Sequence, residues 1–335
     1  MKKSHTYREA GVDIEKAEKS LANVRKNIAR THNSHVLKDI GAFGGFYELP
    51  SGKYKKPVLI SSTDGVGTKL KVAMMMNRHD TVGQDLVNHC INDIAVCGAQ
   101  PLFFLDYYGC GILEIGVFEQ IVDGLTTACQ QAGLPLIGGE TAEMPDVYAP
   151  GDYDLVGTIV GIVEKDNIID GQTIQQGDIL IGVASTGLHT NGFSLARKVL
   201  FSSWKPGDYV AEIGNTLGDE LLRIHRNYLP VITEITSAFP VKGMAHITGG
   251  GLYKNTIRVV PQGLKPAFNW SAWPVPPIFT FIREQGDVPV EDMRQTFNMG
   301  IGLVFILDDK YSGEVLKLAE KFEDNFYSIG TIVPA

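Results

Sequence analysis

The stretch His79–Tyr108, HDTVGQDLVNHCINDIAVCGAQPLFFLDYY, places a helical pattern directly before an apolar strand. From Thr81 to Cys97, apolar residues recur every three or four positions, as on the buried side of an amphipathic helix. The run Pro101–Tyr108 follows after three residues and is typical of a strand. A helix followed at once by a buried strand indicates an α/β layer architecture.

The same alternation extends outward on both sides of this stretch. The segments before residue 165 that read as elements are helices at 13–30 and 114–132 and strands at 57–62, 134–139 and 154–164. After a polar segment, 165–177, strands are expected at 178–186, 244–247, 301–307 and 327–333, and helices from 193, at 217–238 and at 310–324. At roughly 100–200 residues per domain, we predict two domains, 1–170 and 171–335.

Composition and charge exclude several classes of protein. The chain has 335 residues, 44% hydrophobic and 20% charged, as expected of a globular protein. No apolar run of about 18 residues predicts a membrane span, and the start lacks the apolar stretch of a secretory signal, so a cytoplasmic protein is expected. The net charge of −8 argues against a nucleic-acid surface but not against a phosphorylated substrate. No C-x-x-C pair suggests a zinc or redox site.

The first segment that could carry chemistry is DGVGTK, Asp64–Lys69. Gly65 and Gly67 allow a ligand to approach the backbone closely, Asp64 can hold a cation, and Lys69 can meet a phosphate. A tight turn with a surface lysine explains the same residues equally well. The segment is not a Walker P-loop, because G-x-x-x-x-G-K-[ST] is absent there.

A second candidate is the polar face of the helix from Thr81. Asp85, His89 and Asn92 are spaced four and three apart and share one face, which Asp93 adjoins. Carboxylates there and at Asp64 would suit Mg²⁺, which prefers oxygen ligands and substrate phosphates. A solvated helix face is the competing interpretation.

Two further loops follow predicted strands. GGETAEMP, Gly138–Pro145, places acidic residues after an apolar strand, and Glu140 is the better ligand candidate; an acidic surface turn is the alternative. TGLHTNG, Thr186–Gly192, opens a helix, where free N–H groups can bind phosphate and His189 could position or protonate a substrate. Alternatively, a residue of this loop caps the helix and the histidine only fills the turn.

The sequences of these loops resemble those of the phosphoribosylformylglycinamidine cyclo-ligase family, also called aminoimidazole ribonucleotide synthetases. DGVGTK, the quoted His79–Tyr108 stretch, GGETAEMP, TGLHTNGFSLARK, HITGGG (His246–Gly251) and RQTFNMGIG (Arg294–Gly302) run in family order across nearly the whole chain. The resemblance implies an ATP-binding synthetase with two domains. Its N-terminal α/β domain would pair its sheet across a homodimer into a barrel, and its C-terminal domain would be an α/β sandwich.

The resemblance also implies a reaction. Formylglycinamidine ribonucleotide and ATP would give aminoimidazole ribonucleotide, ADP and phosphate, with Mg²⁺ assisting. A monovalent cation is a second candidate cofactor. No nucleic acid or membrane partner is implied.

Roles carried over from the family fall into three groups. The implied metal ligands are Asp64, Asp93 and Glu140. The implied nucleotide-binding residues are Gly41, Gly44, Gly45, Asp64, Gly65, Gly67, Thr68 and Gly139. The implied catalytic residues are Lys69, His189 and Asn191. One departure is that His89 follows Asn88 where relatives are expected to carry a smaller or apolar pair.

Two other interpretations compete with this one. Kinase-like relatives, selenophosphate synthetase and thiamine monophosphate kinase, share the ATP chemistry, but the selenium enzyme would carry a reactive Cys near its N-terminus, and here no Cys precedes Cys90. A non-catalytic nucleotide-binding scaffold would tolerate loss of charged motif residues, yet these are intact.

Overall fold

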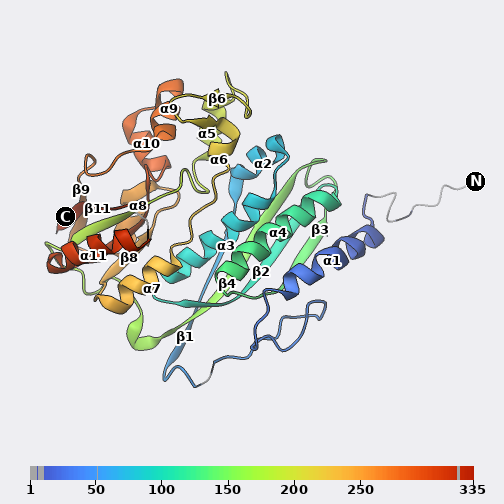
Figure 1. Ribbon diagram of the computed structural model, residues 1–335, viewed down its shortest axis with the longest axis horizontal. Helices are drawn as coiled ribbons and strands as arrows, with labels where there is room; N and C mark the ends of the chain where they lie inside the picture. The colour runs from blue at the N-terminus through green and yellow to red at the C-terminus, as the bar shows by residue number, and fades with distance from the viewer. Residues whose placement is uncertain (1–5, 7–10, 51, 323–324) are drawn as a thin grey trace, which may run out of the picture.

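The computed structural model describes residues 6, 11–50, 52–322 and 325–335, which form two sheets side by side, each with its own helices (Figure 1). The first sheet has the order β1 (Pro57–Gly65), β4 (Tyr153–Glu164), β2 (Gln100–Cys110) and β3 (Leu136–Glu143). Its pairs are antiparallel except β2–β3. β1 and β3 are therefore its two outer strands.

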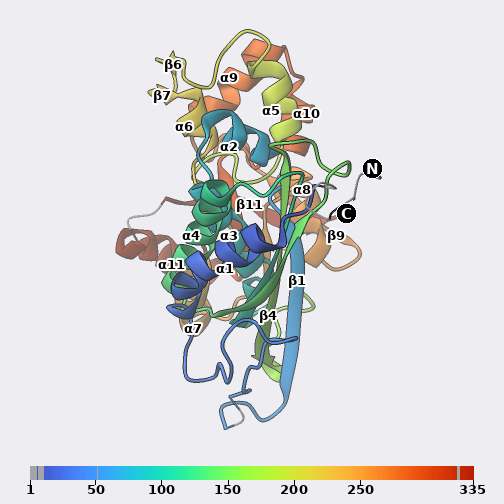
Figure 2. The same ribbon diagram turned by 90° about the vertical axis from the view of Figure 1, so that its right-hand side faces the viewer.

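Helices cover one face of this sheet. They are α1 (Ile14–Ala29), α3 (Asp80–Ala95) and α4 (Ile115–Gln131), while α2 (Leu70–Met76) continues from the end of β1 toward the second domain. Figure 2 shows the sheet from its edge, with these helices on one side of β1 and β4. Among the described residues, no helix of this domain covers the other face.

Two glycines bring α3 and α4 into close contact. A Cβ on Gly83 would lie 2.3 Å from the carbonyl oxygen of Ile121, and one on Gly124 would lie 2.0 Å from that of Asp80. Glycine inside a helix costs roughly 1 kcal/mol relative to alanine, so its presence at both positions reflects this close approach. The contact fixes α3, which carries several of the candidate site residues.

The second sheet is antiparallel throughout. Its order is β8 (Gly243–His246), β10 (Ile301–Leu307), β5 (Ile179–Ala184), β11 (Phe326–Pro334) and β9 (Leu264–Phe268). Alternate residues of its strands enter two buried clusters, one shared with α7 (Leu229–Ala238) and α11 (Ser312–Leu318) and one with α8 (Gly251–Thr256). The sheet thus packs helices on both faces, as strand alternation requires.

A third group of helices joins the two domains. It contains α5 (Phe193–Leu200), α6 (Leu217–Leu221), α9 (Pro277–Gly286) and α10 (Val290–Thr296), beside α2 in Figure 1. Side chains of both domains, such as Leu70 and Phe193, belong to one continuous hydrophobic core. The remaining elements are the two-residue strands β6 (Tyr209–Val210) and β7 (Asn215–Thr216) and short 3₁₀ turns at 67–69, 165–167, 257–259, 309–311 and 319–322.

Three expectations need correction. The helix predicted at 217–238 is two helices, α6 and α7, because the residues between them turn toward α3. The loop predicted at Gly138–Pro145 is strand as far as Glu143, since β3 follows β2 to its end. The structure also has two helices that the sequence did not predict, α9 at 277–286 and α10 at 290–296. Among the described residues, no helix has the length and apolar character needed to cross a bilayer.

Candidate functional site

Two aspartates and four histidines converge where the two domains meet. Asp64 lies near the end of β1, and His89 and Asp93 lie one turn apart on α3. The second domain contributes His189 from the turn before α5, His225 from the segment between α6 and α7, and His246 from the end of β8. These residues come from five separate segments, so the site exists only in the folded chain.

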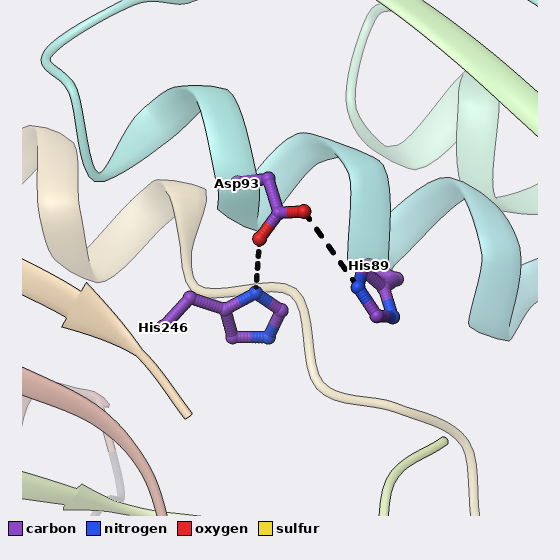
Figure 3. A group of neighbouring side chains, drawn as sticks. All are labelled: His89, Asp93 and His246. Atoms are coloured by element: carbon purple, nitrogen blue, oxygen red, sulfur yellow. Dashed lines mark hydrogen bonds and ion pairs between the residues drawn. The ribbon is translucent and has the colours of Figure 1, made fainter. Parts of the chain in front are cut away.

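Asp93 connects the domains directly. Its Oδ1 accepts a hydrogen bond from Nδ1 of His246 at 2.7 Å, and its Oδ2 lies 3.6 Å from Nε2 of His89 (Figure 3). Nε2 of His89 is also 3.6 Å from Oδ1 of Asp64. Ser62 Oγ donates to Oδ2 of Asp64 at 2.9 Å. Nε2 of His89 therefore lies at the same distance from an oxygen of each carboxylate.

The histidines continue this network into the second domain. Nε2 of His246 and Nε2 of His225 lie 2.9 Å apart, and the latter is also 3.4 Å from Nδ2 of Asn92. Oγ1 of Thr190 lies 2.9 Å from Nδ1 of His89 and 3.3 Å from Nδ1 of His225. The contacts form a closed ring that starts and ends on α3 and crosses the domain boundary twice.

The pKa values of the two carboxyl groups are shifted in opposite directions. Burial raises the pKa of Asp64 to about 6, and the adjacent Asp93 carboxylate adds to the rise. Burial also opposes ionisation of Asp93, but the hydrogen bond and charge of His246 outweigh it and hold its pKa below the usual range. Both side chains keep some exposure, 32% and 27%. Two close carboxylates that solvent can reach favour a bound cation.

The buried imidazoles are held neutral. Burial lowers the pKa of His89 to about 4, with the neighbouring His246 contributing. The pKa values of His189 and His225 lie well below the usual value for the same reason, and the surrounding histidines add to the effect. Each of these three rings therefore carries one hydrogen at neutral pH, on one nitrogen only.

The glycine segment after Asp64 lies against the start of α5. Oγ1 of Thr68 is 3.1 Å from Oγ of Ser194, and Gly67 has a φ of +71°, which favours glycine. Gly65, Gly67 and Thr68 are exposed. This segment therefore offers open backbone beside the two carboxylates, as a phosphate-binding turn requires.

The structure places Lys69 in a buried ion pair between the domains. Its ammonium group is fully buried, forms an ion pair with Asp85 at 2.8 Å and donates to the carbonyl oxygen of Arg223 at 2.7 Å. Burial lowers the pKa of Lys69 while the Asp85 charge opposes that shift. The side chain joins the domains and does not reach the open turn where a phosphate would lie.

His189 is also placed differently from the expectation. Its ring is buried, stacks on His225 with centroids 4.0 Å apart, and accepts a hydrogen bond from the backbone N–H of Thr186 at 3.2 Å. It supports His225 and does not face an open site. Asn191, two residues on, is only half-buried and lies beside Gly249 of the triple-glycine turn.

The remaining predicted residues lie at the far edge of the first sheet. Gly139 and Glu140 are on β3, and Gly45 lies against Ile137 of the same strand. β3 is three strand spacings from β1, or about 14 Å. Strand alternation also points Glu140 to the helix-free face, opposite to Asp64. Within one chain, Glu140 and the Gly41–Gly45 loop do not join the two aspartates.

Two functional histidines had little signal in the sequence. His246 opens the HITGGG motif, so its position at a strand end was visible although its partner on α3 was not. His225 lies inside a predicted helix and had no motif. Only the break between α6 and α7 brings its backbone N–H to Asp85, at 2.6 Å from Oδ1.

A cavity of about 180 Å³ and a second of about 300 Å³ open on the surface. The larger one begins at Gly250 of the triple-glycine turn and carries Lys254, Trp270 and Arg294, whose guanidinium group lies 4.2 Å from the centre of the Trp270 ring. Its lining includes positively charged and aromatic side chains, and Gly250 follows His246 of the histidine cluster by four residues in the sequence.

Comparison with known families covers nearly the whole chain. Residues 52–163 match the family described as AIR synthase related protein, N-terminal domain, and residues 175–335 match its C-terminal domain. The chain is 46% identical over 98% of its length to the phosphoribosylformylglycinamidine cyclo-ligase of Alkaliphilus oremlandii, covering 97% of that protein. It is 46% identical to that of Geobacter sulfurreducens, covering 99% of this chain and 96% of the relative.

Solved structures of more distant proteins share the fold. A thiamine-monophosphate kinase from Stenotrophomonas maltophilia superposes with a TM-score of 0.72 at 17% identity, covering 94% of each chain. HypE of E. coli, a hydrogenase maturation protein, gives 0.66 at 16% identity, covering 96% of this chain and 92% of that one. At such identities the likeness establishes the two-domain architecture and nothing finer.

Proposed function

The chain belongs to the phosphoribosylformylglycinamidine cyclo-ligase family, and on that premise we propose that its catalytic centre is the inter-domain cluster around Asp64 and Asp93. It catalyses the ATP-dependent closure of formylglycinamidine ribonucleotide to aminoimidazole ribonucleotide in purine biosynthesis. This location of the catalytic centre rests on one observation: two accessible carboxylates lie beside an exposed glycine turn where the domains meet.

The chemistry needs a better leaving group. The formyl amide oxygen of the substrate attacks the γ-phosphorus of ATP, and the bond to ADP breaks. The amide nitrogen loses its proton to solvent, and an iminophosphate forms. The neighbouring amidine nitrogen then attacks that carbon, the C–O bond breaks, and phosphate departs with its electron pair as the nitrogen loses a proton. The protein's contribution is positioning and charge neutralisation.

Asp64 and Asp93 would hold Mg²⁺, which would offset charge on the ATP phosphates during transfer. Their oxygen donors, close spacing and partial exposure fit a cation that keeps several waters and binds phosphate. The exposed backbone of Gly65, Gly67 and Thr68 would receive the phosphates. Lys69 is assigned no contact with ATP, since its charge is already paired with Asp85.

The second domain would hold the ribonucleotide. Asn191 is the predicted substrate residue that remains half-open beside the cluster. The cavity with Lys254 and Arg294 would suit the ribose phosphate, because two cationic side chains line it; Glu291 also lines it and is paired with Arg294. His189 is assigned the task of supporting His225 by stacking.

A homodimer would complete the nucleotide site. The helix-free face of the first sheet carries apolar residues, and Leu59 on it is 55% exposed. Phe43, in the Gly41–Gly45 loop, is fully exposed. A two-fold axis along a closed eight-stranded barrel would set the partner's β3 beside β1. That arrangement would bury the apolar face and place the partner's β3, with Gly139 and Glu140, and its glycine loop beside the strand that carries Asp64.

We propose that the two domains divide at 170/171. The first sheet ends with β4 at Glu164, and the second begins with β5 at Ile179. The polar segment between them is the place to separate the domains. A monovalent cation near the phosphates remains part of the proposal without a residue set of its own.

The decisive experiment measures ADP release by the purified chain with Mg²⁺ and ATP, with and without formylglycinamidine ribonucleotide, together with the aminoimidazole product. Equal, substrate-dependent amounts of ADP and product are expected. Loss of both in an Asp93→Asn variant that retains the native melting temperature would locate the centre. ADP release without the ribonucleotide product would refute the proposed reaction.

A further inference from the structure

Nε2 of His89 lies at nearly the spacing of two ligands on one ion from an oxygen of each carboxylate, Asp64 and Asp93. Nε2 of His89 lies 3.6 Å from Oδ1 of Asp64 and 3.6 Å from Oδ2 of Asp93. Both contacts are too long for a good N–H···O hydrogen bond. Two ligands bound at about 2.1 Å to one ion, at tetrahedral or octahedral angles, lie about 3.0–3.4 Å apart. A shift of a few tenths of an ångström would therefore bring both pairs of atoms to the spacing of ligands on one ion.

The other nitrogen of His89 is already occupied. Its Nδ1 lies 2.9 Å from Oγ1 of Thr190 in a buried contact, and a hydrogen on Nδ1 can donate to that hydroxyl oxygen. The lone pair of the neutral ring then lies on Nε2 and faces the carboxylates. A hydrogen bond at the second nitrogen is what orients and fixes the tautomer of a metal-bound histidine.

The neighbouring hydrogen bonds are compatible with this tautomer of His89. Thr190 can donate to Nδ1 of His225, and Nε2 of His225 can donate to Nε2 of His246. Nδ1 of His246 then donates to Oδ1 of Asp93. In this arrangement each hydrogen is used once, and Oδ2 of Asp93, the oxygen that does not accept from His246, lies on the side of His89. The ligands are thus oriented by partners in both domains.

We propose that Nε2 of His89 joins Asp64 and Asp93 in binding a divalent ion, and that this mixed nitrogen and oxygen set prefers first-row transition-metal ions, such as Mn²⁺, to Mg²⁺. The inference rests on the proposed function, because the same carboxylates serve both. Mg²⁺ seeks oxygen ligands and retains its waters, whereas imidazole suits transition-metal ions. His89 would therefore set which metal the enzyme carries.

The test uses Mn²⁺ alone as the probe. The full-length protein, free of nucleotide, is titrated with Mn²⁺ while the free ion is followed by electron paramagnetic resonance, and Mg²⁺ is then added as competitor. The wild type should bind one Mn²⁺ per chain at this site and should release it only to a large excess of Mg²⁺. His89→Leu should weaken Mn²⁺ binding by about 10- to 100-fold.

The Mg²⁺ affinity of His89→Leu, measured in the same titrations, should differ from that of the wild type by less than about threefold. The carboxylate oxygens of Asp64 and Asp93, which Mg²⁺ prefers, remain in this variant. His35→Leu, which removes a histidine remote from the cluster, is the matched control and should bind Mn²⁺ like the wild type. Thr190→Val, which frees Nδ1 of His89, should show an intermediate loss. Melting curves without metal separate these effects from misfolding.

Unchanged Mn²⁺ affinity in a folded His89→Leu variant would overturn the inference. Equal affinity of the wild type for Mn²⁺ and Mg²⁺ would overturn it as well. Neither result touches the proposed function, which is judged by ring closure with saturating Mg²⁺. Conversely, tight Mn²⁺ binding that depends on His89, in a protein that forms no aminoimidazole product, would uphold the site and refute the function.

Discussion

Lys69 and Asp85 form an ion pair whose Nζ and Oδ2 atoms lie 2.8 Å apart with both side chains at 0% exposure. Each partner also bonds to the backbone of the second domain, Lys69 to the carbonyl oxygen of Arg223 and Asp85 to the N–H of His225. The pair therefore fastens the segment before α7 to the first domain. This segment delivers His225 to the cluster, so the pair acts on the site through its position.

Lys69→Met should destabilise the protein by about 3–5 kcal/mol, because it leaves the Asp85 carboxylate buried without a counter-charge. Denaturant unfolding, compared with the wild type at the same pH, measures this change. If the lysine instead met a phosphate of ATP, stability would be nearly unchanged and the KM for ATP would rise.

Lys71→Met is the matched control. Lys71 pairs with Asp152 at 2.5 Å, but both side chains are more than a third exposed. Solvent screens such a pair, so we expect a loss of at most about 1 kcal/mol. A similar loss in both variants would mean that the missing side-chain packing, and not the buried charge, accounts for the effect.

The sequence predicted the helices and strands better than it predicted which side chains contact one another. The three- and four-residue spacing on α3 and the apolar run of β2 are local signals, and both elements form where they were expected. The polar face of α3 could not be read in the same way. Asp85 and Asn92 were expected either at an active site or in solvent, yet both are buried by the second domain.

The reason is distance along the chain. Asn92 donates to the carbonyl oxygen of Arg226 and accepts from the N–H of Tyr228, and Asp85 bonds to a residue 140 positions away. No local pattern encodes such pairings. The motif histidine at 246 was visible as a residue type at a strand end, but its bond to Asp93 depends on how the domains meet.

Asp64→Asn should raise the Mg²⁺ concentration needed for half-maximal ring closure by at least about tenfold, which corresponds to 1.4 kcal/mol of lost binding. The amide is uncharged and cannot replace a carboxylate in the proposed ion site. Steady-state rates at varied Mg²⁺ and saturating ATP measure the shift. Asp166→Asn, at a largely exposed carboxylate, should behave as the wild type. An unchanged Mg²⁺ dependence would remove Asp64 from the metal site.

Acid should weaken the domain junction through His189. Its folded-state pKa lies well below the reference value of 6.5, since burial disfavours the charged ring. The unfolded chain therefore binds the proton first as pH falls below 6.5, and the free energy of unfolding decreases from that point downward. One such group contributes a slope of up to about 1.4 kcal/mol per pH unit.

His189→Gln should flatten that slope by about one proton, because the amide does not titrate. Urea unfolding at a series of pH values between neutrality and mild acid gives the slope for each variant. His35→Gln, at a partly exposed position in the N-terminal segment, is the comparison. Parallel curves for the wild type and His189→Gln would show that the histidine does not resist protonation in the fold.

The proposed dimer makes a prediction that no single-chain site shares. At a Mg²⁺ concentration too low to support turnover by Asp64→Asn, this variant and Glu140→Gln should each leave the homodimer inactive if β1 of one subunit meets β3 of its partner. In mixed dimers, one of the two sites would then collect both substitutions, and the other would be intact. Random assortment of equal amounts should restore about a quarter of the wild-type rate, since half of the dimers are mixed and each has one good site. Refolding the two variants together and measuring ring closure tests this directly. Sites contained within one chain would give no recovery, and full activity of Glu140→Gln alone would exclude that residue from the reaction.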